Sequence, residues 1–330
     1  MKVKSYPVKL FSLLLITLLI SFISLMIGSA DISFLDLLKI LFAGEGNERL
    51  RAIIFEIRLP RILLAVAVGG GLSVAGAVFQ AILMNPLAEP YILGISSGGA
   101  FGAVLSFLLG MSFLGTELLS FAGALAVIFL VFFLGRRFGD LEPNVLLLTG
   151  VMVGAFFSAV ILLMINLLGD SLRTAVFWLI GNLSIASSGA YLFVLPVSIV
   201  ISLLLSANAQ KYNLLAMGDE TAKHLGIDTK KFKNITYILA SILIGTVVSV
   251  SGIIGFVGLL VPHITRLIFG IDNKIVIPAS FLIGASYLTL ADSIARRIIS
   301  PAELPVGAIT AIIGAPVFIY LLRRRFYLYS

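Results

Sequence analysis

The chain has 330 residues, of which 60% are hydrophobic and 12% charged, with a net charge of +7 and a mean hydropathy of +1.14. So much apolar surface excludes a soluble globular protein, because only a lipid bilayer can serve as its solvent. The absence of cysteine excludes disulfides, thiolate metal sites and cysteine nucleophiles. The positive charge is typical of cytoplasmic loops of membrane proteins, so we expect membrane lipid and no nucleic acid as a partner.

Long apolar runs recur along the whole chain and predict one all-α membrane domain, residues 1–330, with about ten transmembrane helices. The first run ends before the small residues 28–30, as in a signal peptide, but it is long enough to span and we expect it to be retained. The run at 256–269 is short and contains Pro262, so we expect it to be packed inside protein. The predicted spans are 10–28, 61–82, 91–110, 114–135, 145–168, 190–207, 235–252, 256–269, 276–295 and 305–322.

Lys and Arg are distributed unequally between the two sets of predicted loops. If the N-terminus is cytoplasmic, 15 of the 23 Lys and Arg lie in cytoplasmic segments, which favours cytoplasmic N- and C-termini. Arg58, Arg61, Arg296 and Arg297 then lie outside, where this rule disfavours them. Asp292 and Arg296 are four residues apart on one predicted helix, so we expect them to pair, whereas the other three arginines have no such local partner.

Residues 85–90, NPLAEP, join two predicted spans on the inside. The two prolines enforce a stiff, extended turn. The turn is either a rigid loop or a constriction that gates a pathway. Gln80 lies about one turn earlier, and an uncharged polar residue at that depth is expected to face protein or a water-filled path.

Residues 169–189 are expected outside the membrane. Their apolar part, 175–180, is too short to span, so it predicts an interfacial or re-entrant half-helix, and Trp178 suits an interface.

Residues 208–234 form a polar, cytoplasmic loop in which apolar residues recur at spacings that suit short amphipathic helices. Gly218 and Gly226 bracket one of them. A loop of this size and pattern favours docking of a partner on one face of the membrane. The predicted short helix carries Glu220, Ala222 and Leu225.

Enzyme motifs are weak in this chain. Residues 94–98 match G-x-S-x-G, but they open an apolar span, so close helix packing is favoured. His263 is expected to be a packing or capping residue, and no metal-ligand cluster appears. The pattern of an ATP-binding P-loop is absent, because Gly-Lys never occurs. A secondary transporter or channel driven by an ion gradient is the alternative, although Glu117 and Asp292 lie near span ends rather than at midplane.

Four segments together resemble FecCD-type permeases. They are RLPRILLAVAVGGGLSVAGAVFQAILMNPLAEPYILGISSGGAFGA at 58–103, LLAMGDETAKHLGI at 214–227, a segment at 252–296 that includes GFVGLLVPHITR, and ELPVGAITAIIGAPVFIYLL at 303–322. The resemblance implies the type II permease fold of ATP-binding cassette (ABC) importers for iron–siderophores, haem or cobalamin. It also implies a homodimer in the cell membrane, two separate ATPase subunits that bind the ATP, and a periplasmic or lipoprotein binding protein. No cofactor is implied in this chain.

The resemblance also implies roles for individual residues. The cytoplasmic gate includes Asn85 and Leu87, and less directly Pro143 and Asn144, because segment 139–144 carries two acids and a proline where the cobalamin importer has a shorter turn rich in Ser and Thr. That difference argues against cobalamin as the cargo. Coupling to the ATPase falls to Gly218, Glu220, Ala222, Leu225 and Gly226, and docking of the binding protein falls to Arg58, Arg61 and Arg296.

Overall fold

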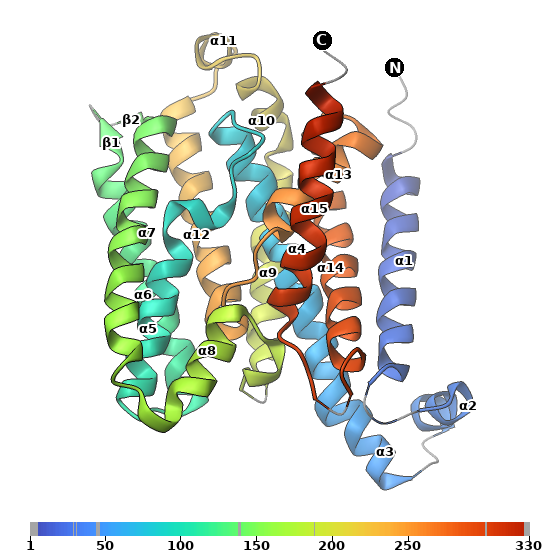
Figure 1. Cartoon of the computed structure of the whole chain (residues 1–330). Helices are drawn as coiled ribbons and strands as arrows, with labels where there is room; N and C mark the ends of the chain where they lie inside the picture. The colour runs from blue at the N-terminus through green and yellow to red at the C-terminus, as the bar shows by residue number, and fades with distance from the viewer. Residues whose placement is uncertain are drawn as a thin grey trace.

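The computed structural model describes residues 6–28, 30, 32–43, 47–137, 140–187, 189–300 and 302–326. Long helices run side by side along one axis (Figure 1). Within the described part, seven helices are long and apolar enough to cross a membrane and three apolar helices are shorter. The seven are α1 (Tyr6–Met26), α4 (Leu59–Ile82), α6 (Phe113–Leu134), α7 (Pro143–Ile165), α9 (Ala190–Ala207), α12 (Thr229–Ser251) and α14 (Asn273–Arg297); the three are α5 (Ile95–Leu108), α13 (Val257–Phe269) and α15 (Val306–Phe326).

Each of the ten predicted spans corresponds to one of these helices, and seven of the described helices reach the length of a full crossing. The all-helical membrane fold is therefore confirmed. The short helix α13 contains Pro262 and is buried over most of its length, as expected for a span packed inside protein.

The shorter elements gather at the two ends of the bundle (Figure 1). The "α11 end" carries α10 (Ala209–Leu215), α11 (Asp219–His224) and the hairpin of β1 (Arg136–Arg137) and β2 (Asp140–Leu141), together with the start of α1 and the end of α15. The "α8 end" carries α2 (Phe34–Leu38), η2 (Lys39–Ala43), α3 (Glu48–Ala52), η3 (Ile53–Arg58), η5 (Gly169–Ser171), α8 (Leu172–Ile180) and η6 (Leu183–Ile185). The remaining short element, η4 (Pro90–Leu93), precedes α5.

Helix α4 lies at the centre of the bundle and is buried along nearly its whole length. It packs on α9, α12, α13 and α14. Small residues make this possible, because a side chain at Gly76 would collide with the carbonyl of Gly258 on α13. Helices α6, α7 and α9 instead expose many large apolar side chains, as expected where a helix faces lipid or another subunit.

Helix α1 packs along α14 through small polar side chains. Thr17 and Ser286 share a hydrogen bond of 2.9 Å, and Ser24 and Ser293 share one of 2.6 Å. Hydrogen bonds between small residues are a common way to join helices in lipid. The first apolar run is thus an integral helix of the described bundle.

The apolar part of segment 169–189 forms the short helix α8, and its tryptophan is buried inside the protein. Trp178 is 4% exposed. Its carbonyl oxygen lies where a side chain on Gly252 would have to sit, and Gly252 has φ +69°, so only glycine fits this close approach. The interfacial or re-entrant position of α8 stays a prediction, and the sequence alone does not show that α8 packs on the turn between α12 and α13.

Candidate functional site

The polar loop at the α11 end folds into two short helices, α10 and α11. Gly218 (φ +104°) and Gly226 (φ +86°) bracket α11, as predicted. Asp219, at the start of α11, accepts a hydrogen bond of 2.6 Å from the buried amine of Lys233 on α12. The loop is therefore attached to a membrane-spanning helix by a charged pair.

The predicted coupling residues of α11 face different directions. Ala222 is fully buried, whereas Leu225, which caps the helix, is 56% exposed. Glu220 is exposed and accepts a 2.9 Å hydrogen bond from Lys223, which lowers the pKa of Glu220. Glu220 and Leu225 are available to a partner, whereas the methyl group of Ala222 packs inside this chain. The coupling roles of these residues stay predictions.

A second set of polar contacts ties α10 to the start of α14. Asp272 accepts hydrogen bonds from the side chains of Asn213 (2.7 Å) and Tyr6 (3.1 Å) and from the backbone N–H of Lys274 (2.9 Å). Asn213 in turn accepts from the backbone and side chain of Asn273 (2.9 Å each). Burial alone would raise the pKa of Asp272, but these hydrogen bonds outweigh it and lower that pKa.

The proposed gate segment leaves α4 in a tight turn. Met84 has φ +49°, a conformation that is uncommon for a residue with a side chain. Asn85 is half-buried, and its side-chain oxygen accepts a 2.9 Å hydrogen bond from the N–H of Leu87. Leu87 is 46% exposed at the α11 end of the chain. The turn is held by local hydrogen bonds, including one of 3.1 Å from the N–H of Asn85 to the carbonyl of Gln80.

Two side chains attach this segment to the turn between α12 and α13. Glu89 accepts a 2.9 Å hydrogen bond from the N–H of Phe256, and Tyr91 accepts one of 3.1 Å from the N–H of Ile254. Phe256 has φ +69°, which costs about 1–3 kcal/mol for a residue with a side chain. On α15, a side chain at Gly314 would approach the Cβ of Phe256 to 2.5 Å, so the turn is held from that side as well.

Pro143 and Asn144 start α7, where Pro143 is half-buried and Asn144 exposed. Residue 139 of the second predicted gate segment, 139–144, lies outside the described residues. Further along α7, Gly150 packs against Ile92 and Leu93 of η4, the short helix that follows the first gate segment. The gate roles of these residues remain predictions.

The predicted docking arginines lie at the α8 end, in a cluster of charges inside the protein. Arg61 binds both oxygens of Asp292 at 2.9–3.1 Å and Glu303 at 2.6 Å. Asp292 is also 3.1 Å from Arg296, which confirms the expected i, i+4 pair. Arg58 donates to the carbonyls of Leu25 (2.7 Å) and Ala30 (2.5 Å).

All three arginines are at most 7% exposed. They do not form the exposed rim that their positions in the sequence predicted, because α1, α14 and the segment before α15 supply internal partners for them. Glu303 was missed by the sequence reasoning, since it is 242 residues away from Arg61 and no pattern links the two. A direct docking role stays a prediction.

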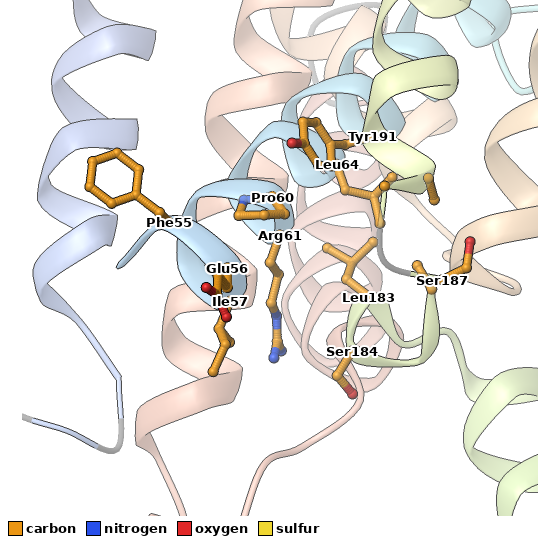
Figure 2. Close-up of a pocket in the computed structure, with 13 residues that line it drawn as sticks. Phe55, Glu56, Ile57, Pro60, Arg61, Leu64, Leu183, Ser184, Ser187 and Tyr191 are labelled. Carbon is orange, nitrogen blue, oxygen red and sulfur yellow. The ribbon is translucent and has the colours of Figure 1, made fainter. Parts of the chain in front are cut away.

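Arg61 still reaches a pocket of about 520 Å³ at the α8 end. Figure 2 shows its side chain between the start of α4 and the loop that carries Leu183 and Ser184. Glu56 and Tyr191 line the same pocket. Glu117 shapes its far wall by accepting two hydrogen bonds from Ser187, at 2.6 and 2.7 Å. Arg61 and Glu56 are the two charged side chains among the described residues that line this opening.

The comparisons with known proteins place this helical membrane bundle in the class of transport proteins. The FecCD transport family profile matches residues 14–324, and the chain belongs to this family. It is therefore a permease subunit of an ABC importer and not an enzyme, since the family's ATPase is a separate subunit.

The chain is similar to two characterised permeases. It is 41% identical to the cobalamin import system permease protein of Halobacterium salinarum, over 84% of this chain and 75% of that protein. It is 36% identical to the molybdate import system permease protein of Haemophilus influenzae, over 98% of both. A solved inward-facing structure described as a metal-chelate type ABC transporter matches with a TM-score of 0.86 and 33% identity, over 96% of this chain and 99% of that one.

Proposed function

We propose that two copies of this chain form a pathway for a metal chelate, which moves from the α8 end to the α11 end by alternating access. A binding protein delivers the cargo at the α8 end, and two ATPase subunits act on α10 and α11 in the cytoplasm. The observation that carries this proposal is the attachment of the polar loop to two membrane-spanning helices. Asp219 joins it to α12, and Asn213 joins it to α14.

The contacts support a route by which motion of this loop reaches the gate. A push on α11 moves α12, because Lys233 and Asp219 are paired. Helix α12 ends at the turn 252–256, to which Glu89 and Tyr91 attach the gate segment. Packed elements linked in this way transmit displacement when each has two discrete arrangements.

The exposed face of α7 supports a homodimer. The side chains of Met152, Phe156 and Leu163 on α7 are 62–72% exposed. The same helix also carries two small residues, Gly150 and Gly154. A second copy that packed on this face would bury these side chains and leave the pathway between the subunits. The orientation, with the α11 end in the cytoplasm, rests on the excess of Lys and Arg in the loops at that end.

For the binding protein, the pocket at Arg61 is the surface we propose. An acidic side chain of that protein would meet the guanidinium of Arg61 there, while Arg58 and Arg296 hold the surrounding helices in place. Charges of this kind steer association and fix register more than they raise affinity.

The proposal for the cargo rests on the cargoes that the names of similar proteins state. The cobalamin permease and the metal-chelate transporter support a bulky chelate such as an iron–siderophore, haem or cobalamin, and the molybdate permease makes a small metal oxyanion the second candidate. An ion-gradient transporter is disfavoured because Asp292, a buried carboxylate in a spanning helix, is already paired with two arginines.

The test is transport by proteoliposomes that contain this chain, its ATPase and its binding protein. We expect ATP-dependent uptake of one labelled chelate. Uptake of molybdate instead would select the second candidate. Uptake that follows a proton or sodium gradient without ATP would overturn the proposal.

A further inference from the structure

A pocket of about 670 Å³ opens at the α11 end, beside α10 and distinct from the exposed surface of α11. It is enclosed by the end of α4 with the gate turn, the end of α10, the last turns of α13, and the turn 270–272 with the start of α14. Its wall includes the side chains of Met84, Met217, Arg266 and Ile271.

The rim of this pocket is apolar and exposed. Ile271 is 83% exposed, Met217 64% and Met84 53%. Contact with lipid does not explain why these apolar side chains are exposed, because the polar residues Asn213, Asp272 and Asn273 line the same pocket. Large apolar side chains among polar groups, with flexible methionines, are typical of a protein-binding surface.

Arg266 lies in the same pocket without an acidic partner. Its guanidinium donates to the side-chain oxygen of Gln80 and, at 3.3 Å, to the carbonyl of Ala77. Among the described residues no ion pair involves this half-buried cation. Asp272 lines the same pocket but forms no ion pair with Arg266, and its two oxygens instead accept hydrogen bonds from Tyr6, Asn213 and Lys274. A cation held away from water favours an anion supplied from outside the chain.

We propose that this pocket and the turn 270–272 form a second docking surface for the ATPase subunit. Ile271, Met217 and Met84 pack against apolar side chains of that subunit, and Arg266 receives one of its carboxylates. The inference rests on the proposed function, which supplies the partner. The proposal is supported because this pocket adjoins the loop on which we propose that the ATPase acts. Met217 belongs to the same polar loop as α11, and Asn213 joins that loop to Asp272, the neighbour of Ile271. Buried arginines with an apolar surround often dominate such interfaces.

The absence of cysteine makes a direct test possible. Ile271→Cys introduces a single thiol, and its reaction rate with a maleimide is measured with and without the purified ATPase subunit. We expect the ATPase to slow labelling at least about tenfold, as burial of a thiol in an interface requires. Leu109→Cys is the matched control, since Leu109 is 64% exposed at the opposite end and its labelling is expected not to change.

Affinity measurements complete the test. We expect Ile271→Asp and Arg266→Gln each to weaken ATPase binding about tenfold, which corresponds to about 1.4 kcal/mol, while Leu109→Asp has no effect. Unchanged labelling and affinity in a complex that Leu225→Asp disrupts would overturn this inference and leave the proposed function standing. If Leu225→Asp also fails to weaken the complex, the loop is not the ATPase site and both proposals fall. If Arg266→Gln reduces retained anionic phospholipid but not ATPase affinity, the pocket binds a lipid headgroup and the inference is wrong.

Discussion

Glu89, in the segment between α4 and α5, accepts a 2.9 Å hydrogen bond from the backbone N–H of Phe256, which is 167 residues away at the start of α13. Phe256 has a left-handed conformation, and residues held in such conformations cluster at functional sites. This contact and the one from Ile254 to Tyr91 are the described hydrogen bonds between the gate segment and the 252–256 turn.

Replacing Glu89 is expected to uncouple ATP hydrolysis from transport. Glu89→Leu leaves the N–H of Phe256 without an acceptor, at a cost of about 1–3 kcal/mol, so the gate segment no longer follows the turn. The number of cargo molecules moved per ATP is expected to fall. Glu89→Gln is the control, because its side-chain oxygen still accepts this bond and coupling is expected to be largely retained. Equal coupling ratios in both variants would contradict this role.

The charged cluster at the α8 end is expected to stabilise the fold. Asp292→Leu leaves Arg61 and Arg296 buried without their shared carboxylate, and loss of one partner from a buried ion pair costs about 3–5 kcal/mol. Glu303→Gln removes a carboxylate that is 36% exposed and is expected to cost at most about 1 kcal/mol. Thermal unfolding of the detergent-purified protein measures the stability of both variants. A larger loss of stability for Glu303→Gln than for Asp292→Leu would show that Asp292 is not the main stabilising carboxylate of the cluster.

Because Arg58 and Arg61 are buried, the double substitution Arg58→Glu with Arg61→Glu is expected to affect folding as well as docking. An exposed rim would tolerate this double change, but buried arginines would not, because each glutamate meets carbonyl or carboxylate oxygens. We therefore expect poor expression, together with loss of stimulation by the binding protein. Normal expression with selective loss of stimulation would restore the simple docking interpretation.

Two substitutions in the 208–234 loop separate folding from docking. Ala222→Trp places a large side chain in a fully buried position and is expected to destabilise the loop by about 1–3 kcal/mol. Leu225→Asp changes an exposed residue, so it is expected to leave stability unchanged and to weaken co-purification of the ATPase. Wild-type stability of Ala222→Trp, or wild-type co-purification of Leu225→Asp, would contradict the respective assignment.

Acid is expected to loosen the contact between α10 and α14. The folded-state pKa of Asp272 is lowered, so the stability it contributes is present above the unfolded pKa of about 3.9 and is lost as the pH falls through the folded value. The effect is small, because Asp272 lies near the surface. The melting temperature between pH 6 and pH 3 is expected to fall less for Asp272→Asn than for the wild type. A parallel decline would show that another group is responsible.

ATP hydrolysis is expected only in the presence of the partner subunit. The chain contains no Gly-Lys dipeptide and hence no P-loop. The purified permease is expected neither to bind nor to hydrolyse ATP, and activity is expected to appear when the ATPase is added. Saturable hydrolysis by the permease alone, at a rate that persists through repeated purification, would contradict this.

The sequence by itself determined the membrane-spanning helices, the turn at 85–90 and the short helix between Gly218 and Gly226. These features depend on local patterns: apolar run length, proline, and glycine at positions with positive φ. The Asp292–Arg296 pair was also accessible, because residues four apart on a helix are neighbours.

Only the tertiary structure decided which side chains meet across the bundle. The Arg61–Glu303, Glu89–Phe256 and Asn213–Asp272 contacts join distant segments, and no periodicity records them. Burial was likewise undecided for Ala222 and Trp178, because a short apolar stretch suits an interface as well as an interior. Helix packing decides whether such a stretch is exposed or buried. That packing depends on how closely small residues in other helices let the backbones approach.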